Sequence, residues 1–133
     1  MKRRRAVFAT AARVPGLYSV IAFLTAKRIV VRGRSMVPTL SPGERVLFDR
    51  IAYVLHDPRT GDVVLARHPV RQGLRMIKRV AEMGDENDYV LLGDNADEST
   101  DSRTLGPFRR EDIVGRAWVV YWPVDRFRVI RCP

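Results

Sequence analysis

The sequence predicts a mostly β domain, an antiparallel barrel or sandwich with one N-terminal helix, and three observations support this class. Turn signals recur at short and regular intervals, as at residues 41–43, 61–62 and 93–95. The runs between them are rich in Val, Ile, Leu and aromatic residues, which is typical of short strands. No long stretch after residue 30 has helical periodicity, so the body of the protein should be an antiparallel β structure.

The apolar runs define the elements that we expect. Seven runs are predicted to be strands: residues 29–31, 45–48, 62–67, 74–80, 89–92, 113–122 and 127–130. The N-terminal segment is predicted to be the only long helix. With 133 residues and 46% apolar composition, the chain fits a single domain with a modest core.

The positive charge of the chain is concentrated at one end. The net charge is +9, and residues 1–43 carry all of it, because they contain nine basic side chains and no acidic one. Residues 44–133 hold 15 basic and 15 acidic side chains. A basic protein can have a nucleic-acid partner, but the composition of this neutral body implies no basic face for one. We therefore expect no nucleic acid among the partners.

The basic end also contains an apolar stretch. Residues 14–26 form an apolar run of 13 residues, and Arg13 separates it from a second run at 6–12. A full membrane span needs about 20 predominantly apolar residues. We expect residues 1–28 to be a basic segment with a membrane anchor helix, which spans the bilayer or lies in its plane, and residues 29–133 to be the β domain. The alternatives are a cleavable secretory signal and an ordinary amphipathic helix packed on the body.

The single cysteine, Cys132, limits the chemistry of the chain. One cysteine excludes an internal disulfide and a cysteine-based metal cluster. It lies one residue from the end, where a fraying chain cannot preorganise a nucleophile. We therefore interpret Cys132 as a free thiol of the tail.

Ser35 is the first candidate for a nucleophile. It lies in segment 33–40, with the sequence GRSMVPTL, between a predicted strand and the turn at 41–43. Gly33 permits a close approach of the backbone, and Pro38 fixes its own φ and favours an extended conformation at the residue before it. This segment could present a rigid hydroxyl, although most serines between Gly and Pro are simply turn residues.

A nucleophilic serine needs a base, and the candidates are His56, His68 and Lys78. Lys78 lies in the apolar run 74–80, which is the kind of run that becomes a buried strand. Burial disfavours the ammonium form and can lower the pKa of a lysine by up to about 3–5 units, so that a neutral amine can accept the serine proton. The alternative is a solvated lysine on an edge strand.

A dense polar segment follows at residues 92–103, with the sequence LGDNADESTDSR. Three interpretations are a calcium loop, a solvated hairpin and a hydrogen-bonded platform behind an active site. An EF-hand calcium loop needs acids at alternating positions, a central glycine and a terminal glutamate, and this order is missing. We therefore expect no metal, and nothing else in the sequence indicates a cofactor.

Four ordered blocks together resemble the type I signal peptidases, which are serine endopeptidases with a Ser/Lys pair. The blocks are residues 33–40, 61–64, 77–80 and 93–103, the last continuing to 114–117. The match runs from about residue 29 to residue 123. The resemblance implies the signal peptidase type of β fold and the removal of N-terminal signal or leader peptides from precursor proteins.

The resemblance also implies a role for each matched residue. Ser35 would attack the scissile carbonyl and form an acyl-enzyme, and Lys78 would take its proton and donate it to the leaving amine. Ser99 would orient the lysine amine. Two ion pairs would brace the site, Asp101 with Arg103 and Asp94 with Arg79. Shallow apolar pockets for small residues before the cut would be lined by Val31, Met36, Leu40 and Ile77.

Three features depart from the family pattern. Gly33 stands where some members carry a serine that helps to bind the oxyanion, so the backbone N–H of Ser35 must contribute more. The chain lacks the proline usual before Gly84, and it lacks the large inserted β domain of many relatives. Its short form, with segments 66–69 and 99–107, is similar to the compact proteases that mature nickel superoxide dismutase.

A general signal peptidase is the favoured function, and other functions stay open. The alternatives are a dedicated maturation protease for one precursor and a catalytically inactive membrane-bound interaction protein. A self-cleaving repressor, which also pairs Ser with Lys, usually carries a DNA-binding domain, and we expect none before residue 30. We expect the N-terminus in the cytoplasm and the catalytic domain outside the cell membrane, or a cytoplasmic protein if residues 6–28 do not span.

Overall fold

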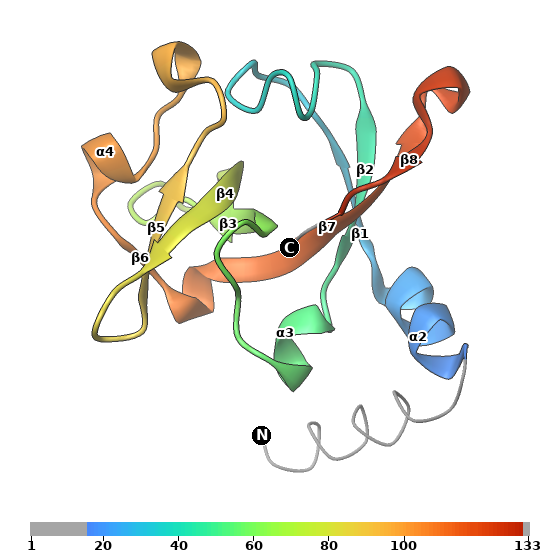
Figure 1. Ribbon diagram of the computed structural model, residues 1–133, viewed down its shortest axis with the longest axis horizontal. Coiled ribbons are helices and arrows are strands. Elements are labelled where there is room, and N and C mark those ends of the chain that lie inside the picture. The colour runs from blue at the N-terminus through green and yellow to red at the C-terminus, as the bar shows by residue number, and fades with distance from the viewer. Residues whose placement is uncertain (1–15, 132–133) are drawn as a thin grey trace.

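The computed structural model describes residues 16–131, and within this range one antiparallel sheet of eight strands forms the body of the protein (Figure 1). The strands are β1 (Lys27–Val30), β2 (Arg45–Asp49), β3 (Val63–Arg67), β4 (Arg75–Met83), β5 (Asp88–Leu92), β6 (Phe108–Arg109), β7 (Ile113–Trp122) and β8 (Arg128–Val129). Their order is β1-β2-β7-β3-β4-β5-β6, and β8 pairs with β7. The predicted mostly β, antiparallel fold is confirmed.

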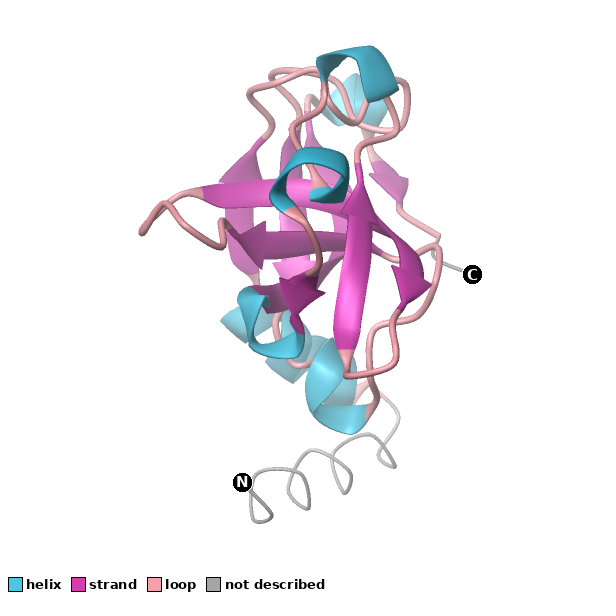
Figure 2. Cartoon of the chain, turned by 90° about the vertical axis from the view of Figure 1, so that its left-hand side faces the viewer, coloured by secondary structure: helices cyan, strands magenta, loops and turns pink. Residues whose placement is uncertain are grey.

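The long strand β7 organises the sheet because it pairs with three other strands. Its residues 116–122 pair with β2, its residues 113–116 pair with β3, and Val119 pairs with Val129 of β8. Both long ladders contain register shifts, which mark β-bulges where a strand bends. The sheet therefore curls, and Figure 2 shows strands that cross one another steeply. In Figure 1, β1 and β4 stand on opposite sides of one interior.

Two clusters of buried apolar side chains stabilise the curled sheet. The first joins β2, β3 and β7 to the segment after β1 and contains Val31, Met36, Leu40, Val46, Phe48, Val63, Leu65, Ala117 and Val120. The second contains Ala52, Tyr53, Val64, Ala66, Val80, Tyr89, Leu91, Phe108 and Ile113. Neighbouring residues of β3 belong to different clusters because successive side chains of a strand point to opposite faces. This burial on both faces explains why β3 is an uninterrupted apolar run rather than an alternating one.

The strands differ most from the predicted ones in two places, and β1 also begins two residues before its predicted start. β4 continues to Met83, beyond the predicted end at residue 80, because its second half pairs with β5 from Arg79 onward. The short strand β6 was not predicted, since two residues are too few to show a period of two. Both differences lie on the side of the sheet that carries β5.

The helices are short and lie at the edges of the sheet. They are α2 (Leu17–Thr25), α3 (Ala52–Leu55) and α4 (Ser102–Leu105), with single 3₁₀ turns η1 (Ala96–Glu98), η2 (Arg110–Asp112) and η3 (Val124–Arg126). Within residues 16–131, none of them has the length and apolar character required to cross a membrane. The predicted anchor falls in part on residues 1–15, which lie outside the described residues, as does Cys132.

Two edges that lack a partner among the described strands, those of β1 and of the first half of β4, border the same cavity. β1 is the end strand of the sheet and pairs only with β2. Residues 75–78 of β4 pair with β3 on one side, whereas β5 pairs with β4 only from Arg79 onward. The backbone N–H and C=O groups of such edges can accept an extended peptide as an added strand.

Candidate active site

Ser35 lies in the loop that connects β1 with β2, and hydrogen bonds hold this loop in place. The Leu40 N–H donates to the Met36 carbonyl over 2.9 Å, and both side chains are buried in the core beneath the loop. The Asn95 N–H donates to the Ser35 carbonyl over 2.8 Å. The backbone of Ser35 is therefore fixed to the turn that follows β5.

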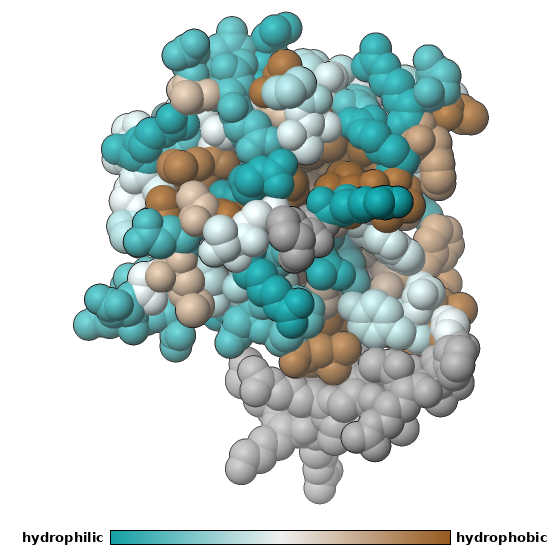
Figure 3. All heavy atoms as spheres, in the orientation of Figure 1, coloured by the Kyte–Doolittle hydropathy of each residue, from teal (hydrophilic) through white to brown (hydrophobic). Residues whose placement is uncertain are grey.

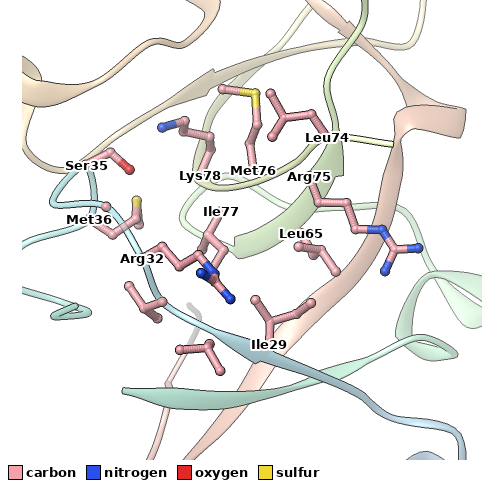
Figure 4. Close-up of a pocket in the computed structure, with 13 residues that line it drawn as sticks. Ile29, Arg32, Ser35, Met36, Leu65, Leu74, Arg75, Met76, Ile77 and Lys78 are labelled. Carbon is pink, nitrogen blue, oxygen red and sulfur yellow. The ribbon is translucent and has the colours of Figure 1, made fainter. Parts of the chain in front are cut away.

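Lys78 lies in β4 opposite Val64 of β3, and only 4% of it is exposed. Figure 4 shows its amine and the hydroxyl of Ser35 pointing toward each other. Burial lowers the pKa of Lys78 below its ordinary value, while the charge of Asp101 partly opposes this shift and the charge of Arg103 adds to it. A buried amine of this kind can act as a neutral base.

A chain of hydrogen bonds continues from Lys78 into the polar segment. Lys78 Nζ donates to Ser99 Oγ over 3.2 Å, and Ser99 Oγ donates to Asp101 Oδ2 over 2.7 Å. Asp101 is completely buried and also accepts the Gly93 N–H over 2.9 Å and the guanidinium of Arg103. Burial alone would raise the pKa of Asp101, but these hydrogen bonds hold it well below its usual range. The ionised Asp101 therefore fixes the Ser99 hydroxyl as an acceptor for the lysine amine.

A second ion pair holds the turn after β5 against β4. Arg79 donates from Nε to Asp94 Oδ1 over 2.8 Å and from Nη2 to Oδ2 over 2.9 Å. This two-point geometry fixes orientation as well as distance. Thr39 Oγ1 also donates to Asp94 Oδ2, over 2.5 Å. Asp94 therefore links the loop of Ser35, through Thr39, to the strand of Lys78, through Arg79.

Gly93 lies where the parts of this site meet. A Cβ at this position would overlap with Ser99 Oγ and would stand 2.7 Å from the Ser35 carbonyl oxygen. No side chain fits at such separations, so the close approach requires glycine. Gly33 is different, because a Cβ there would have no heavy atom within 4 Å.

A cavity of about 390 Å³ extends from Ser35 and Lys78 along the two free strand edges (Figure 4). Its wall is mostly apolar and contains Ile29, Val30, Val31, Met36, Leu65, Leu74, Met76 and Ile77, together with Gly33 and the arginines Arg32 and Arg75. Figure 3 shows apolar patches among hydrophilic side chains on the face of the molecule seen in Figure 1. Leu40, expected in the substrate pockets, does not line the cavity, because it is fully buried below the Ser35 loop.

The side chains of the two histidines make hydrogen bonds outside this cavity. His56 Nδ1 is 2.9 Å from the carbonyl oxygen of Asp57. His68 Nδ1 accepts the backbone N–H groups of Val70 and Arg71. Neither histidine belongs to the cavity lining. Of the three bases considered, only Lys78 lies beside Ser35 in the cavity.

Several residues of the site were absent from the sequence-based set, among them Thr39, Arg32 and Arg75. Nothing in the spacing indicates that Thr39 reaches Asp94, which lies 55 residues further along the chain. The arginines do have a signal in the sequence, because each of them lies three residues before a member of the Ser/Lys pair. This signal becomes useful only when the two segments are known to face each other.

Comparison with known proteins identifies the family of this chain. The family model described as signal peptidase, peptidase S26, matches residues 4–87 and 84–122. The chain is 29% identical to mitochondrial inner membrane protease subunit 1 of Xenopus tropicalis, over 74% of this chain and 71% of the relative. It is 27% identical to signal peptidase I of Leptolyngbya laminosa, over 81% of this chain and 77% of the relative. It is 34% identical to the mitochondrial ATP-independent inner membrane protease subunit 1a of Arabidopsis thaliana, over 76% of this chain and 73% of the relative. Because the family model matches most of the chain, the protein belongs to the signal peptidases of peptidase family S26 and is a serine endopeptidase.

Proposed function

We propose that this chain removes N-terminal leader peptides from precursor proteins, with Ser35 as the nucleophile and Lys78 as the general base. The observation that carries the proposal is a hydroxyl that faces a buried amine at the end of an apolar cavity. Neutral Lys78 accepts the Ser35 proton while the hydroxyl oxygen attacks the scissile carbonyl. Lys78 then protonates the leaving nitrogen, and water hydrolyses the acyl-enzyme on Ser35.

The substrate binds as an extended strand in this proposal. The free edges of β1 and of residues 75–78 in β4 both line the cavity, so a peptide between them can form backbone hydrogen bonds on both sides. Its small side chains before the cut occupy the apolar wall of Val31, Met36 and Ile77. Gly33 carries no hydroxyl, which leaves the Ser35 N–H as the proposed donor to the oxyanion.

The protein acts at a membrane surface in this proposal, with the segment before β1 as the anchor, because Lys27 and Arg28 already pair with β2. The basic charge and apolar stretch of this segment support it, as do the names of two relatives, which are inner membrane proteases. Fractionation of cells that express the full chain tests the anchor. Recovery of the protein in the soluble fraction would contradict it.

Incubation of the full chain with a panel of precursors, followed by N-terminal sequencing of the products, tests the proposed activity. A general signal peptidase is expected to cleave many leaders, whereas a dedicated maturation protease is expected to cleave one. Ser35→Ala serves as the control for contaminating proteases. If wild type gives no new N-terminus on any precursor, leader removal is the wrong function.

The kcat/KM of cleavage is expected to rise with pH through the folded-state pKa of Lys78. An unperturbed lysine titrates near about 10.4. Burial lowers the pKa of Lys78, so the rise should occur below the range of an exposed lysine. Only the deprotonated amine accepts the serine proton, and activity is therefore lost as the pH falls through this value. A pH profile of kcat/KM measures the position of this acidic limb.

Two variants assign the acidic limb to a residue. The double variant His56→Ala/His68→Ala should keep the limb, because neither imidazole lines the cavity. Arg103→Gln should move the limb to higher pH, because the charge of Arg103 lowers the pKa of Lys78. If the limb disappears in the histidine double variant while activity remains, lysine is not the base.

Ser99→Ala is expected to lower kcat by about 10- to 100-fold, a part of the usual contribution of general acid–base catalysis, with little change in KM. The variant removes the acceptor that orients Lys78 Nζ, and Ser99 is therefore a positioning residue. Steady-state kinetics and thermal unfolding measure the two effects separately. Ser102→Ala is the matched control, because its hydroxyl accepts the Leu91 N–H, so its loss should affect stability more than kcat. Unchanged turnover in Ser99→Ala would remove this role.

A further inference from the structure

Two arginine side chains lie in the wall of the active-site cavity, and none of the described residues that line it is acidic. Arg32 and Arg75 both line the cavity, and both are exposed. The ion pairs found within residues 16–131 use other arginines, namely Arg34, Arg79, Arg103, Arg109, Arg110 and Arg128. The described part of the cavity therefore has two positive charges that no neighbouring carboxylate balances.

Arg32 follows β1 and Arg75 begins β4, the two strands whose free edges border the cavity. Arg32 precedes Ser35 by three residues, and Arg75 precedes Lys78 by three residues. Residues 75–78 belong to strand β4, so Arg75 lies about 10 Å along the strand from Lys78, at about 3.3 Å per residue. The chain from Gly33 to Ser35 bends and enters a turn, so Arg32 lies closer to Ser35 than an extended chain would place it. Figure 4 shows both guanidinium groups on the side of Ile29, away from the Ser35 hydroxyl. A peptide that runs along the cavity from the catalytic pair therefore passes both charges.

We infer that Arg32 and Arg75 select substrates with an aspartate or glutamate at the third to fifth position before the cut. The inference rests on the proposed function, because it needs the residues before the cut to occupy the cavity. A residue three to five positions from the cut lies about 10–17 Å from it in an extended chain, which reaches the arginine end of the cavity. A guanidinium binds a carboxylate through two parallel hydrogen bonds, whereas a substrate lysine would be repelled.

Arg34, on the same loop, shows the contrast. Its Nε lies 3.0 Å from Glu98, so the protein already supplies the carboxylate for this side chain. Arg34 does not line the cavity. Arg34 therefore has a carboxylate of the protein as its partner, whereas Arg32 is available to an anion of the substrate.

Peptide pairs that differ in one residue test the inference. The probes are fluorescence-quenched decapeptides with alanine next to the cut and with Glu, Gln or Lys placed in turn at the third, fourth and fifth positions before it. At one of these positions, wild type should cleave the Glu peptide with a kcat/KM about 2- to 30-fold above that of the Gln peptide, the range for two exposed ion pairs. The ratio should fall as salt rises, because salt screens exposed charges.

Charge-changing variants assign the preference to the two arginines. In Arg32→Gln/Arg75→Gln, the ratio for Glu over Gln should fall to about one. In Arg32→Glu/Arg75→Glu, the Lys peptide should become the preferred one, an exchange that a structural role would not produce. Arg59→Gln is the matched control, because Arg59 is exposed and does not line the cavity, so the wild-type ratio should remain.

Binding to Ser35→Ala separates the inference from the proposed function. If wild type cleaves none of the peptides but Ser35→Ala binds the Glu peptide more tightly than the Gln peptide, the proposed function fails and the selectivity stands. Equal cleavage and equal binding of the Glu and Gln peptides at all three positions would overturn the inference. The inference is also wrong if the Glu and Gln peptides are cleaved equally and phosphatidylglycerol vesicles bind wild type but not Arg32→Gln/Arg75→Gln. In that case the two arginines bind a lipid surface.

Discussion

Replacing Ser35 with alanine, or Lys78 with methionine, is expected to reduce peptide cleavage by about 10⁴- to 10⁶-fold. The first variant has no nucleophile, and the second has no group beside the hydroxyl that can take its proton. Because the two side chains act as a unit, the double variant should be little worse than either single variant. Single-turnover kinetics on a cleaved precursor measures all three variants, and circular dichroism confirms that each is folded.

The histidines supply the control for this result. His56→Ala and His68→Ala should keep most of the activity, because neither ring lines the cavity. If either histidine variant is inactive while Lys78→Met cleaves normally, the Ser/Lys assignment is wrong.

Gly93→Ala is expected to damage both the stability and the activity of the protein. The added Cβ would overlap with Ser99 Oγ and stand 2.7 Å from the Ser35 carbonyl oxygen, so both neighbours must move. Overpacking of this kind typically costs about 1–3 kcal/mol of unfolding free energy. A displacement of about 1 Å at a reacting group can lower the rate by about 10²-fold, and we expect a loss of kcat of that size. Denaturant unfolding and steady-state kinetics measure the two effects.

Gly84→Ala is the matched control for Gly93→Ala. A Cβ at Gly84 would meet the Asp88 carbonyl oxygen at 3.6 Å, which is an ordinary contact, and Gly84 lies outside the active site. This variant should keep its stability and its kcat to within about twofold, as is usual for substitutions away from a special feature. Equal behaviour of the two variants would mean that the crowding at Gly93 has no consequence.

The sequence predicted the strands well where two local signals coincide. β2 and β3 lie within one residue of their predicted bounds, because each is an apolar run that begins just after a turn signal, at residues 41–43 and 61–62. β6 escaped prediction because pairing with β5, and not its own two residues, makes it a strand. The second half of β4 was missed for a similar reason, since it contains Glu82 and is a strand through its ladder with β5.

The site was predictable to the extent that family motifs mark it. Ser35, Lys78 and Ser99 lie in matched blocks, and the structure places them in one connected group. Contacts that join distant segments through a common side chain, such as Thr39 with Asp94, leave no periodic trace in the sequence. Leu40 shows the opposite problem, because an apolar residue near the nucleophile can belong either to a substrate pocket or to the core beneath it.

The two unpaired edges that border the cavity determine how a polypeptide can enter it. A site between open edges is a slot, and a chain can be laid into it sideways without being threaded from a free end. A leader that is tethered at one end and continues into a large folded protein at the other is therefore accessible. The entering segment must bring its own N–H and C=O groups unpaired, because both edges need them. A precursor whose cleavage segment is already a helix or a strand has to release that segment before this slot can accept it.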